Sequence, residues 1–367
     1  MEEKINISLS SLSTGNVEMP DQVGHDGPHI AVAGERYSDN IEDYPGGIIV
    51  AIDKPYRWTS ADVVRKVKFA ACRHFHKKKL KVGHAGTLDP LATGVLLVCV
   101  GKATKLAEDL QKHDKEYVAG VTFGATTPSY DLEKEIDKMY PLDGVSEDAL
   151  RGVLPSFLGD QEQIAPLFSA KSVDGVRAYE MARRAYKAAI RDGESFDHSL
   201  EETLSKQMIH ISEIELLSFF ESSTLTERYC LCARRHETPR RSTERCDGAG
   251  VARREQSEGG MPLGAVPKGL GVREQEERSS YEAKPIGLPS SRINVTDNSE
   301  LGLPRAEIRV VCSKGTYIRA LARDLGEALG SGAHLDSLRR TRTGDFRVEN
   351  ALTIEQAIEL FKENNKN

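Results

Sequence analysis

Residues 81–100, KVGHAGTLDPLATGVLLVCV, constrain the fold of this chain more than any other stretch. Their second half contains VLLVCV at 95–100, a continuous apolar run that is typical of a central strand buried on both faces. Glycines in the first half permit tight turns, and Pro90 holds the residue before it in an extended conformation. Asp89 is therefore expected at the mouth of a buried sheet, where a carboxylate needs a cation to offset the cost of its charge.

Three interpretations of a glycine-rich turn with a single acid compete. A P-loop requires Lys and then Ser or Thr after its last glycine, and neither stands there. GHAG at 83–86 has the GxxG form of a KH-domain loop, but the strands around it do not match that domain. The third is a structural turn in which Asp89 only caps backbone amides, and for an isolated Asp-Pro pair this would be favoured.

Hydrophobic periodicity and capping signals predict the other elements of the fold. Strands are expected at 48–52, 117–123, 207–220 and 307–312. The first expected helix is capped by Ser60 and has Val63, Val64, Val67 and Ala71 on one face. The second contains Leu321, Leu325 and Leu329 and ends at Gly330. The last begins with a capping box of Thr353 and Gln356.

Two segments lack the composition of a packed domain, in keeping with a hydrophobic content of 39% and a mean hydropathy of -0.44. Residues 1–45 are polar and aperiodic, so a disordered lead is expected. Residues 226–303 mix glycine, proline, arginine and glutamate with almost no large apolar residues, which indicates a low-complexity, disordered insertion between two strands that belong together. One folded domain, 46–225 with 304–363, remains.

The cysteines indicate neither a disulfide framework nor a zinc ribbon, because the six of them form no CxxC pair. Cys72, Cys99 and Cys312 have apolar neighbours and are expected in the core. A further group within the insertion matches no common zinc module, so no metal is expected. That group consists of Cys230, Cys232, His236 and Cys246.

The net charge of -6 and the pI of about 6.0 by themselves argue against a nucleic-acid partner, although phosphate binding depends on where the charges lie. No apolar run reaches membrane-spanning length, and the polar, acidic start does not match a signal peptide. A cytoplasmic protein is therefore expected.

The string GHAGTLDPLATGVL closely resembles the catalytic motif of the TruB family of tRNA pseudouridine synthases. Four other stretches resemble that family in the same order along the chain: GIIVAIDKPYRWTS, DKEYVAGVTFGATTPSYD, PLFSAKSVDGVRAYEMAR and CSKGTYIRALARDLGEALGSGAHLDSLRRTRTGDF. Together they cover about residues 46–220 and 305–360. The resemblance implies an α+β pseudouridine synthase fold, with a central mixed, largely antiparallel sheet flanked by helices and a catalytic cleft.

The activity implied by the resemblance is isomerisation of uridine to pseudouridine in the T loop of tRNA, at the position numbered 55. Substrate and product are isomers, so no cofactor is expected. By resemblance Asp89 is the nucleophile, and Arg319 is the cation that keeps it ionised and in position. Tyr117 matches the tyrosine that stacks on the target base and is a candidate proton acceptor. Outside these motifs, Arg319 would be an ordinary surface arginine and Tyr117 half-buried packing.

The resemblance also implies residues that contact the RNA around the target base. Tyr317 and Leu338 match positions that line the uridine pocket, although a plain core role fits Leu338 nearly as well. His84 matches a residue that helps hold the RNA loop open once the base has left its stack. Lys54 is expected to be structural or close to the RNA.

Basic residues gather near these motifs and predict a phosphate-binding surface despite the acidic net charge. The weaker candidates for contact with the RNA backbone are Lys77, Lys78, Lys79, Lys81, Arg339 and Arg340. A further basic group consists of Arg183, Arg184 and Lys187.

Members of the family often carry a C-terminal PUA domain, and the short stretch after Phe346 leads us to expect none here. The implied partner is the T arm of tRNA, with no obligate protein partner and a monomeric state. Two alternatives stay open: an RNA-guided synthase of the dyskerin type, and a non-catalytic tRNA-binding chaperone.

Overall fold

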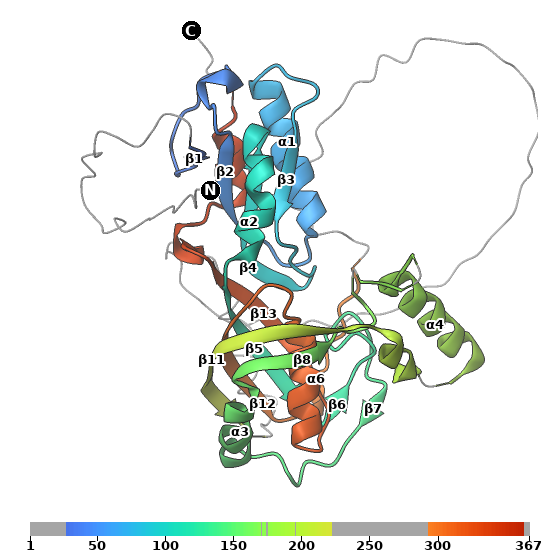
Figure 1. The fold of residues 1–367 in the computed structure, drawn as a ribbon. Helices are drawn as coiled ribbons and strands as arrows, with labels where there is room; N and C mark the ends of the chain where they lie inside the picture. The colour runs from blue at the N-terminus through green and yellow to red at the C-terminus, as the bar shows by residue number, and fades with distance from the viewer. Residues whose placement is uncertain (1–26, 170, 174, 195, 222–292, 363–367) are drawn as a thin grey trace, which may run out of the picture. The chain divides into compact units, whose positions relative to one another are not determined.

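The computed structural model describes residues 27–169, 171–173, 175–194, 196–221 and 293–362, all of which belong to one structural unit (Figure 1). The strands of its large sheet are β1 (His29–Ile30), β2 (Ile48–Lys54), β3 (Val82–Ala85), β4 (Ala92–Val100), β5 (Lys115–Phe123), β8 (Gly159–Ile164), β11 (Lys206–Phe220), β12 (Arg305–Cys312), β13 (Ala333–Thr343) and β14 (Phe346–Arg347). The helices are α1 (Ser60–His74), α2 (Ala107–Lys112), α3 (Glu147–Val153), α4 (Ala178–Asp192), α6 (Ile318–Ala328) and α7 (Ile354–Glu359).

The large sheet has the strand order β1-β2-β4-β13-β5-β12-β11-β8, with β3 beside β4 and β14 beside β13. The pairs β1–β2 and β4–β13 are parallel, whereas the other pairs are antiparallel. The predicted mixed, largely antiparallel sheet with helices is thus confirmed. β11 and β12, the strands on either side of the predicted insertion, pair with each other as expected.

The apolar run in β4 is a central strand, as predicted, because alternate side chains enter two different cores. Leu96 and Val98 pack into a large cluster that includes the buried face of α1. Leu97 and Cys99 point to the opposite side, into a smaller cluster that includes Leu110 of α2. A strand buried on both faces carries apolar residues without alternation, which explains the sequence pattern.

Two predicted helix caps had different outcomes. Ser60 does not cap α1, because the cap is Thr59, which forms a capping box with Asp62. Ser60 is instead buried and bonds to a loop distant in sequence. The capping box of Thr353 and Gln356 at the start of α7 is confirmed, with backbone-to-side-chain bonds of 2.8 and 3.2 Å.

Both segments predicted to be disordered contain residues that pack against the domain, which corrects their boundaries. Residues 27–45 add β1 to the sheet edge, and Tyr37 is 2% exposed and lies 5.5 Å from the ring of Phe361. Ile293 is 9% exposed, and its carbonyl accepts a 2.7 Å bond from Arg57. Contacts between distant segments supply this burial, so local composition does not reveal it. The parts of these predictions that fall on residues 1–26 and 226–292, with the Cys230 group, lie outside the described residues.

No helix in the described part of the chain is both long enough and apolar enough to span a membrane.

Gly94 yields a first testable prediction. It has a φ of +102°, and a β carbon there would lie 2.1 Å from the backbone oxygen of Arg340. The Gly94→Ala variant should therefore unfold more readily, by about 2–4 kcal/mol, in urea titrations. Gly83→Ala is the control, because a β carbon at Gly83 meets no atom within 4 Å. Equal urea midpoints for the two variants would contradict the prediction.

Candidate active site

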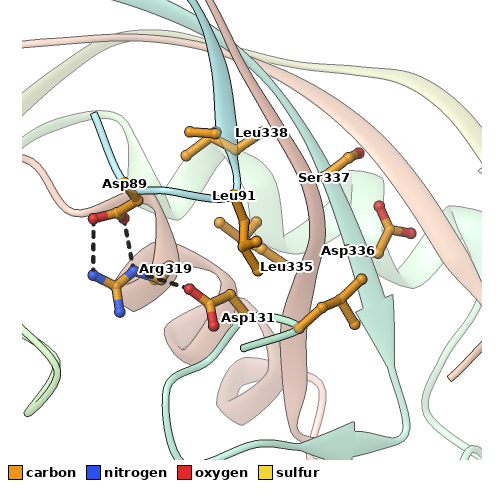
Figure 2. Close-up of a pocket in the computed structure, with 10 residues that line it drawn as sticks. Asp89, Leu91, Asp131, Arg319, Leu335, Asp336, Ser337 and Leu338 are labelled. Atoms are coloured by element: carbon orange, nitrogen blue, oxygen red, sulfur yellow. Dashed lines mark hydrogen bonds and ion pairs between the residues drawn. The ribbon is translucent and has the colours of Figure 1, made fainter. Parts of the chain in front are cut away.

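The structure joins Asp89 to Arg319, the pair that the sequence analysis assigned as nucleophile and cation (Figure 2). Arg319 lies in the first turn of α6 and is only 5% exposed. Its Nε donates to Asp89 Oδ2 at 2.8 Å, and its Nη2 donates to Oδ1 at 3.2 Å. This two-point contact fixes the direction of the carboxylate as well as its distance from the cation.

The rest of the Arg319 guanidinium is engaged by groups that the sequence analysis did not assign. Nη1 donates to the carbonyl of Ser129 and Nη2 to the carbonyl of Phe168, each at 3.0 Å. Asp131 Oδ2 lies 3.7 Å from Nε. Burial by itself would lower the pKa of Arg319, but the charges of Asp89 and Asp131 outweigh it and raise the pKa. The guanidinium therefore stays a cation with a fixed orientation.

Three buried side chains hold the loop that carries Asp89. Ser60 Oγ accepts a bond from the amide of Leu88 at 3.0 Å and lies 3.2 Å from the carbonyl of the same residue. Lys54 Nζ donates to the carbonyl of Pro90 at 3.3 Å. Arg340 donates to the carbonyls of Gly86 and Thr87 at 3.2 and 3.4 Å. The loop is thus fixed on both sides of Asp89.

Lys54 has the structural position that was one of its two expected roles, whereas Arg340 does not lie on the surface where an RNA-backbone contact was expected. Lys54 is fully buried and also donates to the carbonyl of Trp58 at 2.7 Å, and burial lowers its pKa to about 7. Arg340 is 1% exposed and donates to the carbonyl of Val95 at 2.7 Å. Neither side chain reaches the surface, because each satisfies backbone carbonyls that the loop leaves unpaired.

Tyr117 lies in β5 near this loop. It stands opposite Arg340 of β13, which stands opposite Gly94 of β4. Burial raises the pKa of the Tyr117 phenol, and the charge of Asp89 adds to this rise whereas Arg340 opposes it. The phenol therefore carries its proton at neutral pH.

A cavity of about 10 Å³ lies beside Asp89, room for about one water molecule. Its lining includes Leu338 but not Tyr317 or Tyr117. The other lining residues are Leu91, Ala92, Asp131, Leu132, Arg319, Leu335, Asp336 and Ser337. A uracil ring is much larger than this space, so the cavity as it stands cannot hold a base.

The remaining predicted contacts lie on separate elements. His84 is half-buried in β3, and burial and the charge of Arg340 lower the pKa of its imidazole. Tyr317 precedes α6, where its amide and carbonyl bond to the Gln163 side chain at 2.9 and 3.1 Å. No cluster of three or more His, Cys, Asp or Glu side chains in the described part of the chain is arranged to hold a metal ion.

The basic candidates other than Arg340 reach the surface. Arg339 pairs with Asp53 at 2.9 Å and keeps 43% of its side chain exposed, and Lys77 pairs with Glu42 at 2.5 Å. Lys78, Lys79 and Lys81 are exposed, as are Arg183, Arg184 and Lys187 on α4.

Local sequence patterns did not reveal the roles of Ser60, Ser129 and Asp131. The last two belong to the stretch TTPSYD, which was part of the family resemblance, but a carboxylate and a carbonyl in a loop carry no local signal of a distant arginine. Ser60 stands next to the true helix cap, which explains its assignment as a cap.

Fold and site together define a class of protein: a mixed α/β protein whose large sheet positions an arginine-paired carboxylate at the rim of a small cavity. Two family models match the chain, the N-terminal domain of TruB family pseudouridylate synthase over residues 73–230 and the tRNA pseudouridylate synthase B C-terminal domain over residues 319–367.

Curated relatives agree with these matches. A protein of Phocaeicola vulgatus named tRNA pseudouridine synthase B is 39% identical over 85% of this chain and 92% of its own length. One of the same name from Thermus thermophilus is 35% identical over 83% of this chain and 76% of its own length. The chain belongs to the TruB family of pseudouridylate synthases. A chain in the solved structure "Crystal Structure of a Cbf5-Nop10-Gar1 Complex" is 22% identical over 89% of this chain and 60% of that chain, with a TM-score of 0.45.

Proposed function

We propose that this protein converts uridine to pseudouridine in the T loop of tRNA, at position 55, with Asp89 as the nucleophile. The observation that carries the proposal is the two-point bond between Asp89 and the buried Arg319, found in a member of the TruB family. Its relatives named tRNA pseudouridine synthase B support tRNA as the substrate.

The reaction needs an anionic nucleophile and a site that retains the detached base. The N1–C1′ bond of the uridine breaks, the base turns over, a C5–C1′ bond forms, and C5 loses its proton while N1 gains one, so that the product is an isomer of the substrate. Asp89 is suited to covalent attachment because Arg319 orients its carboxylate through two hydrogen bonds. The site must also close around the detached base, to limit its escape and its reaction with water.

Substrate binding requires the target uridine to leave its stack, at a cost of roughly a few kcal/mol. We assign the ring of Tyr117 to stacking on this base and Leu338 to the pocket wall. His84 contacts the RNA loop, and its lowered pKa leaves it neutral at pH 7. Exposed lysines such as Lys78 and Lys79 bind phosphates.

The test is release of tritium from tRNA labelled at C5 of uridine, followed by mapping of the product with carbodiimide and primer extension. Purified protein should release one tritium per tRNA, with a single primer-extension stop at position 55, and a transcript with cytidine at that position should release none. A stop at another position would reject the assigned site, and no release from any tRNA would reject the activity.

The two alternatives give different results in the same assay. An RNA-guided synthase would need an added guide RNA, whereas we expect turnover by the purified chain alone. A non-catalytic chaperone would bind tRNA without releasing tritium. The bond geometry between Asp89 and Arg319 favours catalysis, because binding alone does not require an oriented carboxylate.

We expect residues 230–287 to be dispensable for folding and catalysis, because their composition provides few apolar side chains for a core. Replacing them with a short glycine–serine linker should preserve the circular dichroism spectrum and tritium release. A deletion extended to residue 300 is the contrasting variant. It removes buried Ile293 and the 2.8 Å bond from the amide of Thr296 to Leu132, and should lower the thermal midpoint. Insoluble protein after the shorter deletion would contradict the prediction.

A further inference from the structure

A second polar cluster lies next to the loop and the helix that hold Arg319, and it contains Tyr130, His198, Glu201 and Arg323. The Tyr130 hydroxyl lies 3.0 Å from His198 Nδ1 and 3.4 Å from Glu201 Oε2. Arg323 Nη1 donates to Glu201 at 2.8 Å, and its guanidinium lies 5.7 Å from the centre of the Tyr130 ring. His198 and Glu201 belong to the 3-10 helix η4 (His198–Thr203), so the cluster joins that helix to α6.

Tyr130 is the residue of this cluster that touches the active-site loop. It stands between Ser129 and Asp131, the two residues of the loop that face the Arg319 guanidinium. Its φ is +54°, which is unfavourable for a residue with a β carbon, and its side chain is buried. Such a conformation persists only where surrounding contacts hold it.

The backbone and the side chain of Tyr130 are both held. Its amide donates to Thr127 and its carbonyl accepts a bond from the amide of Leu335, each at 3.0 Å. The hydroxyl is the remaining polar group, and it is bonded within the cluster. Arg323 stands one turn after Arg319 on α6. The cluster therefore contacts α6 through Arg323, and through Tyr130 it contacts the loop that faces Arg319.

His198 lies among charged groups from several elements. Its Nε2 is 2.6 Å from Asp137, which precedes β7 (Lys138–Met139), and its Nδ1 is 3.8 Å from Glu201. Burial would lower the pKa of the imidazole, but Asp137 and Glu201 raise it to about 9. His198 is therefore a cation at neutral pH, with two N–H groups that donate to Asp137 and to the Tyr130 hydroxyl.

We propose that Tyr130, His198, Glu201 and Arg323 form a positioning cluster that holds Ser129 and Asp131 against Arg319 and thereby sets the orientation of Asp89. The inference rests on the proposed function, because its main readout is the rate of pseudouridine formation. These residues do not touch the cavity beside Asp89, so they act through the loop and through α6.

A separate cavity of about 610 Å³ gives solvent access to the cluster. Tyr130, His198 and Arg323 line it, together with Asp137, Lys138 and Glu327 as further charged groups. Solvent can therefore exchange the proton of His198, and the rate of the reaction should respond to the charge of this residue.

Tyr130→Phe tests the proposal, because it removes only the hydroxyl and keeps the ring. We expect kcat for tritium release to fall roughly tenfold, the effect of about one lost hydrogen bond to a charged group, with KM and tRNA affinity unchanged. Tyr140→Phe is the matched control, since Tyr140 lines the same cavity and, within the described part of the chain, makes no hydrogen bond to residues 129–131. Its kcat should equal that of the wild type.

His198→Gln adds a pH readout. The folded-state pKa is raised, so the contribution of the imidazolium is complete below about pH 6.5 and is lost as the pH rises through about 9. The ratio of wild-type kcat to His198→Gln kcat should therefore fall toward one above pH 9.

The outcomes separate the two proposals. Wild-type protein that releases no tritium rejects the proposed function. If the wild type is active, the positioning cluster is overturned when Tyr130→Phe has the kcat of the wild type. It is also overturned when Tyr140→Phe loses as much kcat as Tyr130→Phe. The cluster is likewise overturned if the ratio of wild-type kcat to His198→Gln kcat stays constant with pH. Thermal midpoints of both variants show whether the fold is kept, and if Tyr130→Phe unfolds, the pH ratio of His198→Gln decides.

Discussion

Replacing Asp89 with Asn should abolish pseudouridine formation while tRNA binding stays largely intact. The amide has nearly the shape of the carboxylate, but it lacks an anionic oxygen to form the covalent bond. Loss of a nucleophile commonly costs an enzyme at least about a thousandfold in kcat. Tritium release under single-turnover conditions measures the loss, and filter binding measures the affinity.

The structure explains why the Asp89→Asn variant should fold. Arg319 keeps Asp131, Ser129 and Phe168 as partners, so the buried cation is not left alone. Asp53→Asn is the control with the same chemical change, at a carboxylate that pairs with exposed Arg339. Turnover by Asp89→Asn at the rate of this control would reject Asp89 as the nucleophile.

Arg319→Lys should be the second most damaging change. A single ammonium cannot reproduce the two-point contact with Asp89 and the bonds to two carbonyls, because lysine lacks the planar fork of arginine. We expect kcat to fall about a hundredfold to a thousandfold, in the range seen when one oriented donor is removed from an active site. The variant should also unfold more readily, because Asp131 is buried and its pairing is weakened.

Arg65→Lys is the matched control, since Arg65 is largely exposed and pairs with Asp62 on the first turns of α1. Its kcat and its urea midpoint should equal those of the wild type. If Arg319→Lys kept wild-type kcat, the orientation of Asp89 by the guanidinium would not matter for the reaction, and the role assigned to Arg319 would be wrong.

Local patterns predicted those parts of the fold that depend on neighbours in sequence. The continuous apolar run of β4 and the capping box of Thr353 and Gln356 are examples, because burial on two faces and helix capping each leave a signature within a few residues. The pairing of Asp89 with Arg319 came from the family resemblance rather than from a local pattern. Its geometry agrees with that assignment.

Other side chains could not be assigned from local patterns because their partners lie far along the chain. Arg340 belongs to a basic stretch that is typical of a phosphate-binding surface, yet it bonds to Gly86 and Val95 inside the sheet. This depends on the insertion of β13 between β4 and β5. Lys54 likewise bonds to carbonyls of the loop around Asp89 rather than to solvent.

The sequence by itself determined the class of the fold, its central strand and the family motif that contains Asp89. The tertiary structure alone decided which charges are buried, which of them face Arg319, and that Tyr130 adopts a left-handed conformation beside them. The physical reason is that periodicity and capping are short-range properties, whereas the burial and pairing of a charge depend on which distant strands and loops become neighbours.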